Sequence, residues 1–579
     1  MQSTPASANP RPYKTYKIGR ARAAKSGEDV AQPDVFDQLY IRHPRRWLTA
    51  ILLAYLLVAS LYALLTPPWQ APDEPAHYNY IAHLATTGSL PILRMGDYNQ
   101  PLLEKAVRLN FPSSFPIEQL RYESYQPPLF YMIATPLFWL TGGSLMALRL
   151  FNVILVACAI LLFYACLDFV FPRKHLIVLG ATGFAALLPM HVAMSAAVNN
   201  DGLAELLTVA SILALIHWMH DRFGSELADG GEVGQRRERF QLLLLGLLVG
   251  LGMLTKIYGH MVLLIVLLVV FVVAWRHPRP QTSDGRLGRM RPAVRSAAWV
   301  ILPALLLALP MWLRNGALYG VQDLLGLAWH DQVVIGQPRT DQWIAQFGWV
   351  AYGERAINLT FRSFWGAFGW LGLFLDQRIY TAFLLFTSVL FMGLLWSVVR
   401  LISGEPDTDM NHFQISVLIL FGVVVAAVFA GYIWYNAKFV QHQGRYFFWG
   451  LLPIGAFVAL AWREVLHPMQ GIITGLLAAV LAGSLAIIGW MMGSLDKWTI
   501  VTISLIALFL LLQPLLLIGT NQVRIERLPL WLQKWAERPW LMTTLCYMRP
   551  VAWAMPFILL FVLNVWIPGW FILPQFGPR

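Results

Sequence analysis

The sequence predicts an all-helical membrane protein with about thirteen transmembrane helices and two long loops on the outer side. Of its 579 residues, 57% are hydrophobic and 13% are charged. Soluble proteins carry about 25% charged residues, so this composition excludes a string of soluble domains. The hydrophobic residues also fall into runs of roughly 17 to 25 residues, the length that a helix needs to cross a hydrocarbon core of about 30 Å.

The chain starts with a polar and basic segment, 1–46, which lacks apolar periodicity and is predicted to be a flexible cytoplasmic tail. The first span begins at residue 47. We interpret it as an uncleaved anchor, because a cleavable signal has a shorter apolar region nearer the start. The other spans are expected to begin near residues 146, 175, 203, 240, 257, 296, 380, 413, 446, 470, 498 and 551. The run 240–275 is too long for one span and is divided at Lys256, whereas the shorter run 127–141 is expected to form a re-entrant or interfacial helix.

Basic residues indicate the orientation of these spans. When the N-terminus is placed in the cytoplasm, the inner segments hold most of the 43 Lys and Arg residues, as the positive-inside rule requires. An odd number of spans then places the C-terminus outside, and the protein is expected in the inner (plasma) membrane, in contact with membrane lipid. The formal net charge of +12 therefore reflects membrane topology, and no nucleic-acid partner is expected.

Beyond the tail, the chain is predicted to have three parts. Residues 47–312 form a transmembrane module that includes the first long external loop, 67–145, residues 313–379 form the second external loop, and residues 380–579 form a C-terminal transmembrane region. Loops longer than about 15 residues are usually functional or disordered, and the Trp, Tyr, Phe and Pro content of these two indicates ordered interfacial helices. Chemistry is therefore expected on the outer face. The short inner loops lack a glycine-rich phosphate loop, which argues against a nucleotide-driven pump.

Two adjacent carboxylates, Asp73 and Glu74, follow the first span on a proline-rich turn. One reading is that either of them caps a helix that runs to about Thr87 and ends at Gly88, because carboxylates are favourable at helix N-termini. The other reading is catalytic: a carboxylate at the membrane surface can accept a proton from a hydroxyl group. His77 lies one helical turn beyond Asp73 and would share that site.

A third external carboxylate, Asp201, lies at the outer end of the fourth span, where ionisable groups are candidates for function. The alternative is that Asn200 or Asp201 caps this helix. Gln126 and Tyr131 belong to a proline-rich stretch of the first external loop and are candidates for a supporting role.

Positive charge is sparse on the outer side, so each instance is informative. The candidates are Lys256 between two spans, Arg314 after the seventh span, Arg362 in the second external loop, and Arg445 with its neighbour Tyr446. The planar guanidinium group suits a phosphate oxyanion. The alternative is that these side chains only snorkel to lipid headgroups from the ends of spans.

These motifs occur in a fixed order on one side of the membrane, from residue 47 to about residue 453. They are Asp-Glu at 73–74, Gln-Pro-Pro-Leu-Phe-Tyr at 126–131, Asn-Asp at 200–201, Thr-Lys at 255–256, Arg-Asn at 314–315 and Gln-Gly-Arg-Tyr at 443–446. Together they resemble the GT-C superfamily of membrane glycosyltransferases. More narrowly, the chain is similar to the bacterial branch related to protein O-mannosyltransferases and to the aminoarabinose transferase of lipid A.

The resemblance implies a GT-C fold with 47–312 as the catalytic module. It also implies inverting transfer of a sugar from a polyprenyl-phosphate donor to a hydroxyl of an acceptor glycan, lipid or protein. The implied roles are Asp73 as general base, Glu74 holding the acceptor or orienting the base, His77 and Asp201 as a second acidic or acceptor site, Lys256, Arg314 and Arg445 binding the donor phosphate, and Gln126, Tyr131, Arg362 and Tyr446 in support. No cofactor or metal is expected beyond the lipid-linked sugar, although the external carboxylates leave a divalent ion open.

A transporter or flippase of a lipid-linked saccharide is the main alternative from another class. It would be favoured by charged residues at the centres of spans and by two inverted halves of the sequence. The sequence has neither feature, and an assembly scaffold without activity would leave the acidic external loop without a purpose.

Overall fold

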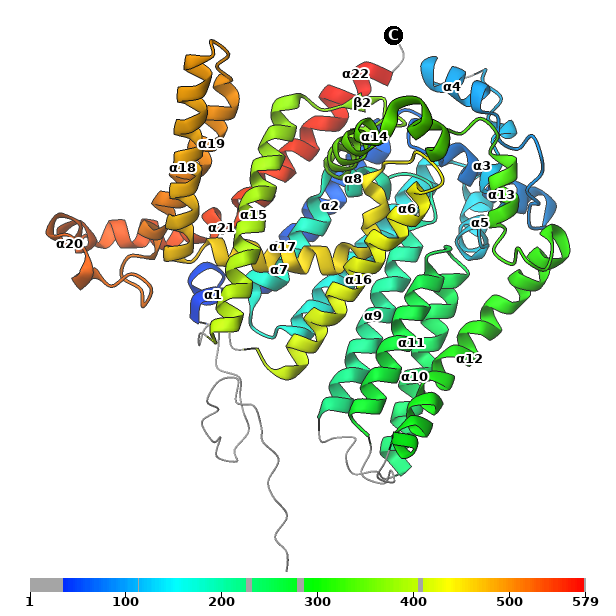
Figure 1. The fold of residues 1–579 in the computed structure, drawn as a ribbon, viewed down its shortest axis with the longest axis horizontal. Coiled ribbons are helices and arrows are strands. Elements are labelled where there is room, and N and C mark those ends of the chain that lie inside the picture. Colours follow the sequence, from blue (N-terminus) through cyan, green and yellow to red (C-terminus); the bar gives the residue numbers. More distant parts are fainter. Residues whose placement is uncertain (1–34, 113, 225–231, 279–285, 405–409, 577–579) are drawn as a thin grey trace, which may run out of the picture.

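The computed structural model describes the whole chain except residues 1–34, 113, 225–231, 279–285, 405–409 and 577–579. The described residues form a bundle of long helices with shorter helices gathered at one end (Figure 1). Eleven helices among them are long and apolar enough to cross a membrane, or twelve if one bent pair is a single span. The predicted all-helical, multi-pass architecture is therefore confirmed, while the count of thirteen spans is not.

Each predicted span falls on a helix. The long helices are α2 (Pro44–Leu65), α6 (Leu145–Val170), α9 (Asp201–Phe223), α10 (Glu232–Met253), α11 (Gly259–Arg276), α12 (Arg286–Tyr319), α15 (Gln377–Ser403), α16 (His412–Asn436), α17 (Leu451–Val465) with the preceding 3-10 turn η5 (Gly444–Gly450), α18 (Pro468–Met491), α19 (Lys497–Leu512) and α21 (Pro539–Ile567).

Two features account for the lower number of spans. Helices α7 (His175–Leu187) and α8 (Pro189–Ser195) meet at an angle of 61°. Pro189 pushes the residue before it into extended backbone, and Leu188 has a ψ of 115°. Helix α10 begins with charged residues and is free of charge only from Phe240 onward, so its apolar part is short.

The predicted division at Lys256 is confirmed, because α10 ends at Met253 and α11 begins at Gly259. The break is tight: a Cβ atom on Gly259 would lie 2.5 Å from the backbone of Gly252. Glycine is therefore required for this approach, which leaves Lys256 at the tip between two helices. The short run 127–141 forms the apolar helix α5 (Leu129–Thr141), as expected.

The two long external segments lie at the same end of the bundle (Figure 1). The first contains α3 (Glu74–Thr87), α4 (Gln100–Arg108), the 3-10 turns η1 (Ile117–Gln119) and η2 (Tyr122–Tyr125), and α5; the second contains α13 (Leu327–Val333), α14 (Thr340–Trp365) and the hairpin β1 (Ala367–Phe368) with β2 (Leu373–Phe374). The lower ends of α9, α10, α11 and α12 lie at the opposite end. This separation is what loops on one side of a membrane require.

Several contacts join the two external segments directly, and one of them reaches the turn before Asp73. The indole Nε1 of Trp370 donates a hydrogen bond of 2.9 Å to the carbonyl oxygen of Trp69, and the Trp370 ring stacks on Phe111 with centroids 6.0 Å apart. Trp69 is four residues before Asp73, so the second external segment helps to fix the turn that leads into α3.

The predicted flexibility of the tail, 1–46, is wrong from residue 35 onward, and its first 34 residues lie outside the described part of the chain. Residues Val35–Tyr40 form helix α1, which is packed in the core. The fully buried Asp37 accepts hydrogen bonds from Arg463 Nε and from the backbone N–H of Leu176, each 2.8 Å long. The partner on α17 is 426 positions away, so no local sequence pattern could indicate this anchor.

We predict that Asp37→Asn destabilises the protein by about 3 kcal/mol, because it removes the charge that faces a buried guanidinium group. The measurement is the free energy of unfolding in detergent, followed by loss of helical signal. Asp341→Asn, which changes an exposed carboxylate, is the matched control and should have no effect. Equal stability of the two variants would contradict this role of Asp37.

Candidate active site

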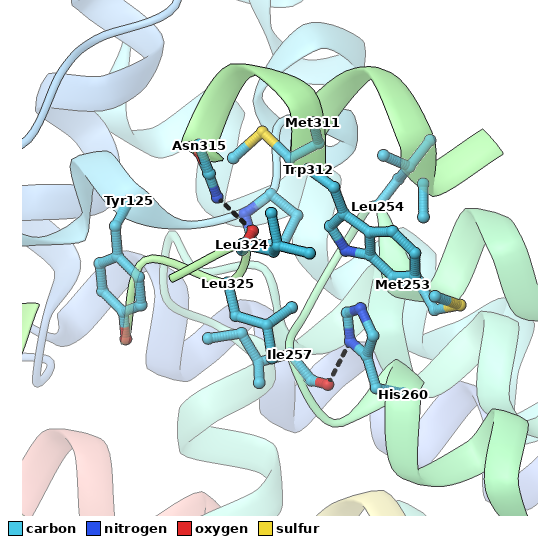
Figure 2. Close-up of a pocket in the computed structure, with 12 residues that line it drawn as sticks. Tyr125, Met253, Leu254, Ile257, His260, Met311, Trp312, Asn315, Leu324 and Leu325 are labelled. Atoms are coloured by element: carbon cyan, nitrogen blue, oxygen red, sulfur yellow. Dashed lines mark hydrogen bonds between the residues drawn. The ribbon is translucent and has the colours of Figure 1, made fainter. Parts of the chain in front are cut away.

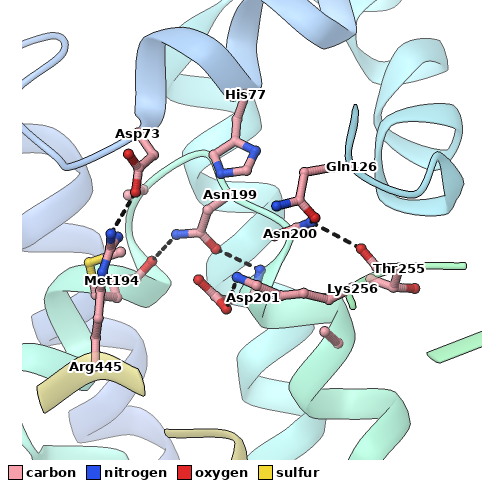
Figure 3. Close-up of polar contacts among 12 residues, drawn as sticks. Asp73, His77, Gln126, Met194, Asn199, Asn200, Asp201, Thr255, Lys256 and Arg445 are labelled. Carbon is pink, nitrogen blue, oxygen red and sulfur yellow. Dashed lines mark hydrogen bonds and ion pairs between the residues drawn. The ribbon is translucent and has the colours of Figure 1, made fainter. Parts of the chain in front are cut away.

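Asp73 stands at the turn into α3, with its carboxylate pointing away from the helix. Its backbone is left-handed, with a φ of 66°, and its side chain makes no capping hydrogen bond. Instead Oδ1 accepts a hydrogen bond of 2.9 Å from the hydroxyl of Tyr122, and Oδ2 accepts one of 2.6 Å from Nη2 of Arg445 (Figure 3). The helix bounds Glu74–Thr87 followed by Gly88 are confirmed, but capping by the Asp73 side chain is wrong.

The surroundings of Asp73 keep it ionised. Burial raises the pKa of this carboxyl group. Arg445, His77 and the two hydrogen bonds lower it by a larger amount, so the pKa lies below its usual range. Left-handed backbone at a residue other than glycine costs on the order of 1–3 kcal/mol and persists only where the surrounding structure enforces it. The fold thus maintains a strained backbone in order to direct a carboxylate at Arg445.

Asp201 and Lys256 form a second ion pair close by (Figure 3). Asp201 is the first residue of α9 and Lys256 is the tip between α10 and α11. The two tips are held together by Asn200, whose Nδ2 donates a hydrogen bond of 3.0 Å to the carbonyl oxygen of Thr255. The alternative that Asn200 or Asp201 caps α9 is wrong, since neither side chain makes a capping hydrogen bond.

One residue of each ion pair, Arg445 and Asp201, lines a small shared recess. It is lined by Val156, His191, Met194, Ser195, Asp201, Gly202, Glu205, Arg445 and Phe448. A Cβ atom on Gly202 would lie 2.9 Å from Oδ1 of Asn152, so glycine is needed for α9 to approach α6 here. Arg445 therefore faces Asp73 and also borders the space in front of Asp201.

Glu74 does not hold an acceptor, contrary to the expectation. It is fully buried, and Arg149 donates to both of its oxygens, from Nε at 2.8 Å and from Nη2 at 2.6 Å. The backbone N–H groups of Trp69 and Val198 also donate to this carboxylate. Glu74 thus fixes the backbone beside Asp73. Its predicted role in orienting Asp73 stays a prediction.

His77 on α3 and Tyr131 on α5 join these two helices. The Nδ1 atom of His77 lies 2.8 Å from the hydroxyl of Tyr131, whose ring stacks on Tyr80 with centroids 3.6 Å apart. Burial lowers the pKa of His77 to about 4, with Lys256 also lowering it and Asp73 opposing this effect. His77 is therefore neutral at pH 7 and acts as a hydrogen-bonding group without adding positive charge.

Gln126 and Tyr446 also lie at the site. Oε1 of Gln126 is 3.5 Å from Nδ2 of Asn200, and its Nε2 is 3.3 Å from the hydroxyl of Tyr125. The guanidinium group of Arg445 lies 5.7 Å from the centre of the Tyr446 ring. Both residues thus contact groups that border the two ion pairs.

Arg314 and Arg362 are not brought into this cluster by any hydrogen bond or ion pair within the described chain. Nη2 of Arg314 donates to the carbonyl oxygen of Pro91 at 2.5 Å, which fixes the first external loop against α12. Arg362 donates to Oε1 of Gln377 at 2.7 Å and lies over the ring of Tyr380. The expected phosphate and supporting roles of these two arginines have no basis in the geometry.

Several residues at the site were missed in the sequence, and Glu123 is the most informative. It lies in η2, next to Tyr122, and is largely buried. Its Oε2 has no hydrogen-bond partner in the described part of the chain. Burial and then Asp73 raise the pKa of Glu123 to about 7. The sequence feature that could have indicated Glu123 is its position three residues before Gln126, in a segment with few other acidic residues.

The sequence did not decide whether the external carboxylates bind a metal ion. Among the described residues, no group of three or more His, Cys, Asp or Glu side chains is arranged to hold a metal ion. The charges around Asp73 and Asp201 are instead compensated by Arg445 and Lys256. Independence from metal stays a prediction.

We predict that Glu123→Gln removes a pH dependence of stability. The pKa of Glu123 is near 4.5 in the unfolded chain and about 7 in the folded protein. The folded state therefore binds this proton more tightly, and the free energy of unfolding falls as the pH rises from about 4.5 to about 7. The variant should equal wild type at pH 4 and exceed it at pH 8 by up to about 3 kcal/mol.

The measurement is the free energy of unfolding of both proteins between pH 4 and pH 8. Glu118→Gln, an exposed change in the same external segment, is the control and should follow wild type throughout. A constant difference between Glu123→Gln and wild type across this range would show that Glu123 does not titrate near neutrality.

Comparisons with known proteins extend the description of this site. Residues 120–319 match the family model of dolichyl-phosphate-mannose-protein mannosyltransferases. The comparison with curated protein sequences finds no match. Among solved structures, the chain is similar to the oligosaccharyltransferase of Archaeoglobus fulgidus in the apo form, with 13% identity, a TM-score of 0.43, and coverage of 80% of this chain and 56% of that one. The chain thus spans little more than half of the archaeal protein.

It is also similar to ArnT from Cupriavidus metallidurans. The apo structure gives 13% identity, a TM-score of 0.45, and coverage of 92% of this chain and 78% of that one. The structure bound to undecaprenyl phosphate gives 12% identity, a TM-score of 0.43, and coverage of 89% and 76%.

The family match runs from the start of the turn that carries Tyr122 and Glu123 to the end of α12. It includes Asp201 and Lys256, one of the two ion pairs at the site. It agrees with the resemblance that the motifs predicted, because this part of the chain is similar to the dolichyl-phosphate-mannose-protein mannosyltransferases.

Proposed function

We propose that the protein transfers a sugar from a polyprenyl-phosphate donor to a hydroxyl group of an acceptor glycan, lipid or protein, with inversion at the anomeric carbon. The observation that carries the proposal is the 2.6 Å contact between Asp73 and Arg445, at a recess that is also lined by Asp201, the partner of Lys256. This arrangement brings a base and two cations together, and transfer from a lipid phosphate requires both kinds of group.

The chemistry follows from what each group can do. The oxygen of the acceptor hydroxyl attacks the anomeric carbon, while the bond from that carbon to the phosphate oxygen breaks and its electron pair stays on the phosphate. Asp73 takes the hydroxyl proton, and Arg445 and Lys256 stabilise the charge that develops on the leaving phosphate. A phosphate is a good leaving group, so positive charge near it serves better than a proton donor.

The ion pair in the unliganded protein suggests how the base becomes active. Arg445 is the main group that lowers the pKa of Asp73, against the effect of burial. A donor phosphate that binds Arg445 weakens this interaction and leaves the buried carboxylate more basic. Binding of the donor would thereby prepare the base for the acceptor, which accounts for the direct pairing of two catalytic groups in the resting state.

An apolar cavity beside the site supports a lipid-linked donor (Figure 2). Its lining includes Met253, Leu254, Ile257, Met311, Trp312 and Leu325. Ile257 is the neighbour of Lys256, and Tyr125, which also lines the cavity, is the neighbour of Gln126. The isoprenoid units next to the phosphate are therefore assigned to this cavity, and the rest of the chain to the surrounding lipid.

The proposed location is the plasma membrane, with the N-terminus in the cytoplasm and the site on the outer side. The positive-inside distribution of charge supports this orientation, and both external segments that build the site lie at one end of the bundle. Reaction without a metal ion is part of the proposal, because two cationic side chains already serve the phosphate.

We predict that Asp73→Asn lowers transfer by about 10²- to 10⁴-fold, the usual contribution of a general base, while donor binding persists. The measurement is transfer of radiolabelled sugar from a panel of polyprenyl-phosphate sugars to acceptors in membrane extracts, with purified protein. The exposed Asp341→Asn variant is the control and should retain full activity. If the wild-type protein moves labelled lipid across a vesicle bilayer and transfers no sugar, the function is that of a flippase and the proposed enzyme activity is refuted.

We predict that Leu325→Trp raises the KM for the polyprenyl donor roughly tenfold, with little change in kcat, since it fills the cavity and displaces about two buried CH₂ groups of the lipid. The comparison is with Leu318→Trp, which adds the same bulk at an exposed position of the same external region. An unchanged KM in Leu325→Trp would place the isoprenoid chain elsewhere.

A further inference from the structure

Exposed arginines gather at one end of α10, α11 and α12, remote from the candidate active site. α10 and α12 begin at this end and α11 finishes there, and in Figure 1 it lies opposite the two long loop segments. The exposed residues are Arg236 on α10, Arg276 on α11, and Arg289, Arg291 and Arg295 on α12. We refer to these residues as the arginine layer.

The packing of α10 against α11 brings two of these side chains to the same depth. The helices meet at Gly252 and Gly259, where a Cβ atom on Gly259 would lie 2.5 Å from the backbone of Gly252. A helix rises about 1.5 Å per residue, so Arg236 lies about 24 Å from this contact along α10. Arg276 lies about 26 Å from the same contact along α11. The two arginines are therefore level with each other at the far end of the helices.

The packing of α10 against α12 brings a third arginine to that depth. A Cβ atom on Gly246 would clash with the carbonyl group of Val300, so the two helices are in close contact there. Arg236 lies about 15 Å from this contact along α10, and Arg291 lies about 14 Å from it along α12. Three neighbouring helices thus present guanidinium groups in one layer.

The arginine layer lies where the apolar parts of the helices end. α11 has no Asp, Glu, Lys or Arg before Arg276, and α12 has none between Arg295 and Arg314. Hydrocarbon chains surround such charge-free segments, and charged residues at the ends of the segments lie at the level of the lipid headgroups. In the proposed orientation these are the headgroups of the inner leaflet.

The nearby carboxylates are already bound to other arginines. In the described parts of α9 to α12, the carboxylates at this end are Asp221, Glu232 and Glu238. Asp221 accepts a contact of 2.7 Å from Nη2 of Arg237, and Glu238 accepts one of 2.9 Å from Nη1 of Arg222. Glu232 is exposed at the first turn of α10. The arginine layer itself makes no hydrogen bond or ion pair with any residue that the structure describes.

Two members of the layer, Arg291 and Arg295, are one helical turn apart and share a face of α12. Like charges at this spacing destabilise a helix. An anion between the two side chains removes that repulsion, and a phosphate group accepts paired hydrogen bonds from a guanidinium group. The layer therefore favours binding of an anion that carries a phosphate.

The same face of α12 becomes apolar beyond the two arginines. Leu302, Leu306 and Leu313 follow Arg291 at nearly whole numbers of helical turns and continue this face. Their exposed fractions are 64%, 70% and 64%. A pair of charges followed by a long exposed apolar strip matches the headgroup and acyl chain of a phospholipid, whereas a soluble anion would use the arginines alone.

We propose that the arginine layer binds an anionic phospholipid, with Arg291 and Arg295 holding its phosphate and the exposed leucines of α12 contacting an acyl chain. Arg236 and Arg276 add positive charge at the same depth, which disfavours a headgroup that carries its own cation. A bound lipid neutralises the layer and connects three helices. The inference does not depend on the proposed function, because the layer lies at the other end of the bundle.

The test compares two phospholipids that share a phosphate but differ in net charge. Phosphatidylglycerol is anionic, whereas phosphatidylcholine carries a compensating choline. Dissociation constants of both lipids are measured for the full-length protein in detergent by native mass spectrometry. We expect wild type to bind phosphatidylglycerol at least about tenfold more tightly than phosphatidylcholine. In the double variant Arg291→Gln, Arg295→Gln this preference should fall below about threefold.

Matched variants separate this site from a general effect of positive charge. Arg291→Lys with Arg295→Lys keeps both charges and should retain most of the preference. Arg45→Gln with Arg46→Gln removes two exposed arginines from the first turn of α2 and should keep the full preference. Arg295→Gln alone should give an intermediate value, which provides the test if the double Gln variant does not fold.

Equal affinity of wild type for the two lipids would overturn the site, because it would show that the arginines are solvated without a lipid partner. A tenfold preference that persists in the Gln variants would overturn the assignment to α12. Displacement of phosphatidylglycerol by inorganic phosphate at equal concentration would show a site for a soluble anion and would also overturn the inference. None of these results depends on whether the protein transfers sugar.

Discussion

The buried ion pair between Glu74 and Arg149 is the interaction on which the rest of the site depends. Both side chains are nearly inaccessible, and Arg149 also donates to the carbonyl oxygens of Ala63 and Thr66 at the end of α2. The carboxylate in turn accepts from the backbone N–H of Val198, next to the start of α9. Three helices and the external loop therefore meet at one charged group. Removal of either partner would leave a buried charge, which costs about 3–5 kcal/mol, so the strained backbone of Asp73 is held by a strong constraint.

Around this anchor, the protein places three acid–base pairs, the third of them His191 with Glu205, along one recess, at the end of the bundle where the two long loop segments lie. Each pair joins elements that are distant in sequence: Asp73 and Arg445 are 372 positions apart, and Lys256 and Asp201 are 55 apart. Charges at the edge of a membrane are costly unless they are compensated, and pairing keeps the unliganded site close to neutral. In the proposed reaction the same pairing would make the site responsive, because an anionic donor would compete for the cations and free the carboxylates. Stability without substrate and activity with it thus come from the same contacts.

Three residues that the sequence predicted for the site have partners elsewhere in the protein, for a common reason. Glu74, Arg314 and Arg362 have the right chemistry and the right side of the membrane, but each is used to fix a loop or a helix end. Residue type and sidedness show which side chains can reach an external site, and they do not show which of them are already bound by the protein. Glu205 and His191 were overlooked for the opposite reason: both lie within apolar helices, and only the bend at Leu188 brings His191 to α9.

The sequence by itself determined the helical, multi-pass architecture, the two long loop segments at one end of the bundle, the bounds of α3, the division at Lys256 and the resemblance to membrane glycosyltransferases. These properties depend on runs of neighbouring residues, such as apolar stretches, proline and glycine at helix ends, and basic loops, so they can be read locally. The tertiary structure alone decided that Asp73 faces Arg445, that Glu74 is an anchor, that α1 is pinned by Arg463, and that Glu205 has a free oxygen at the recess. Those facts depend on which helices pack together across hundreds of residues, and a hydrophobic face does not specify its partner.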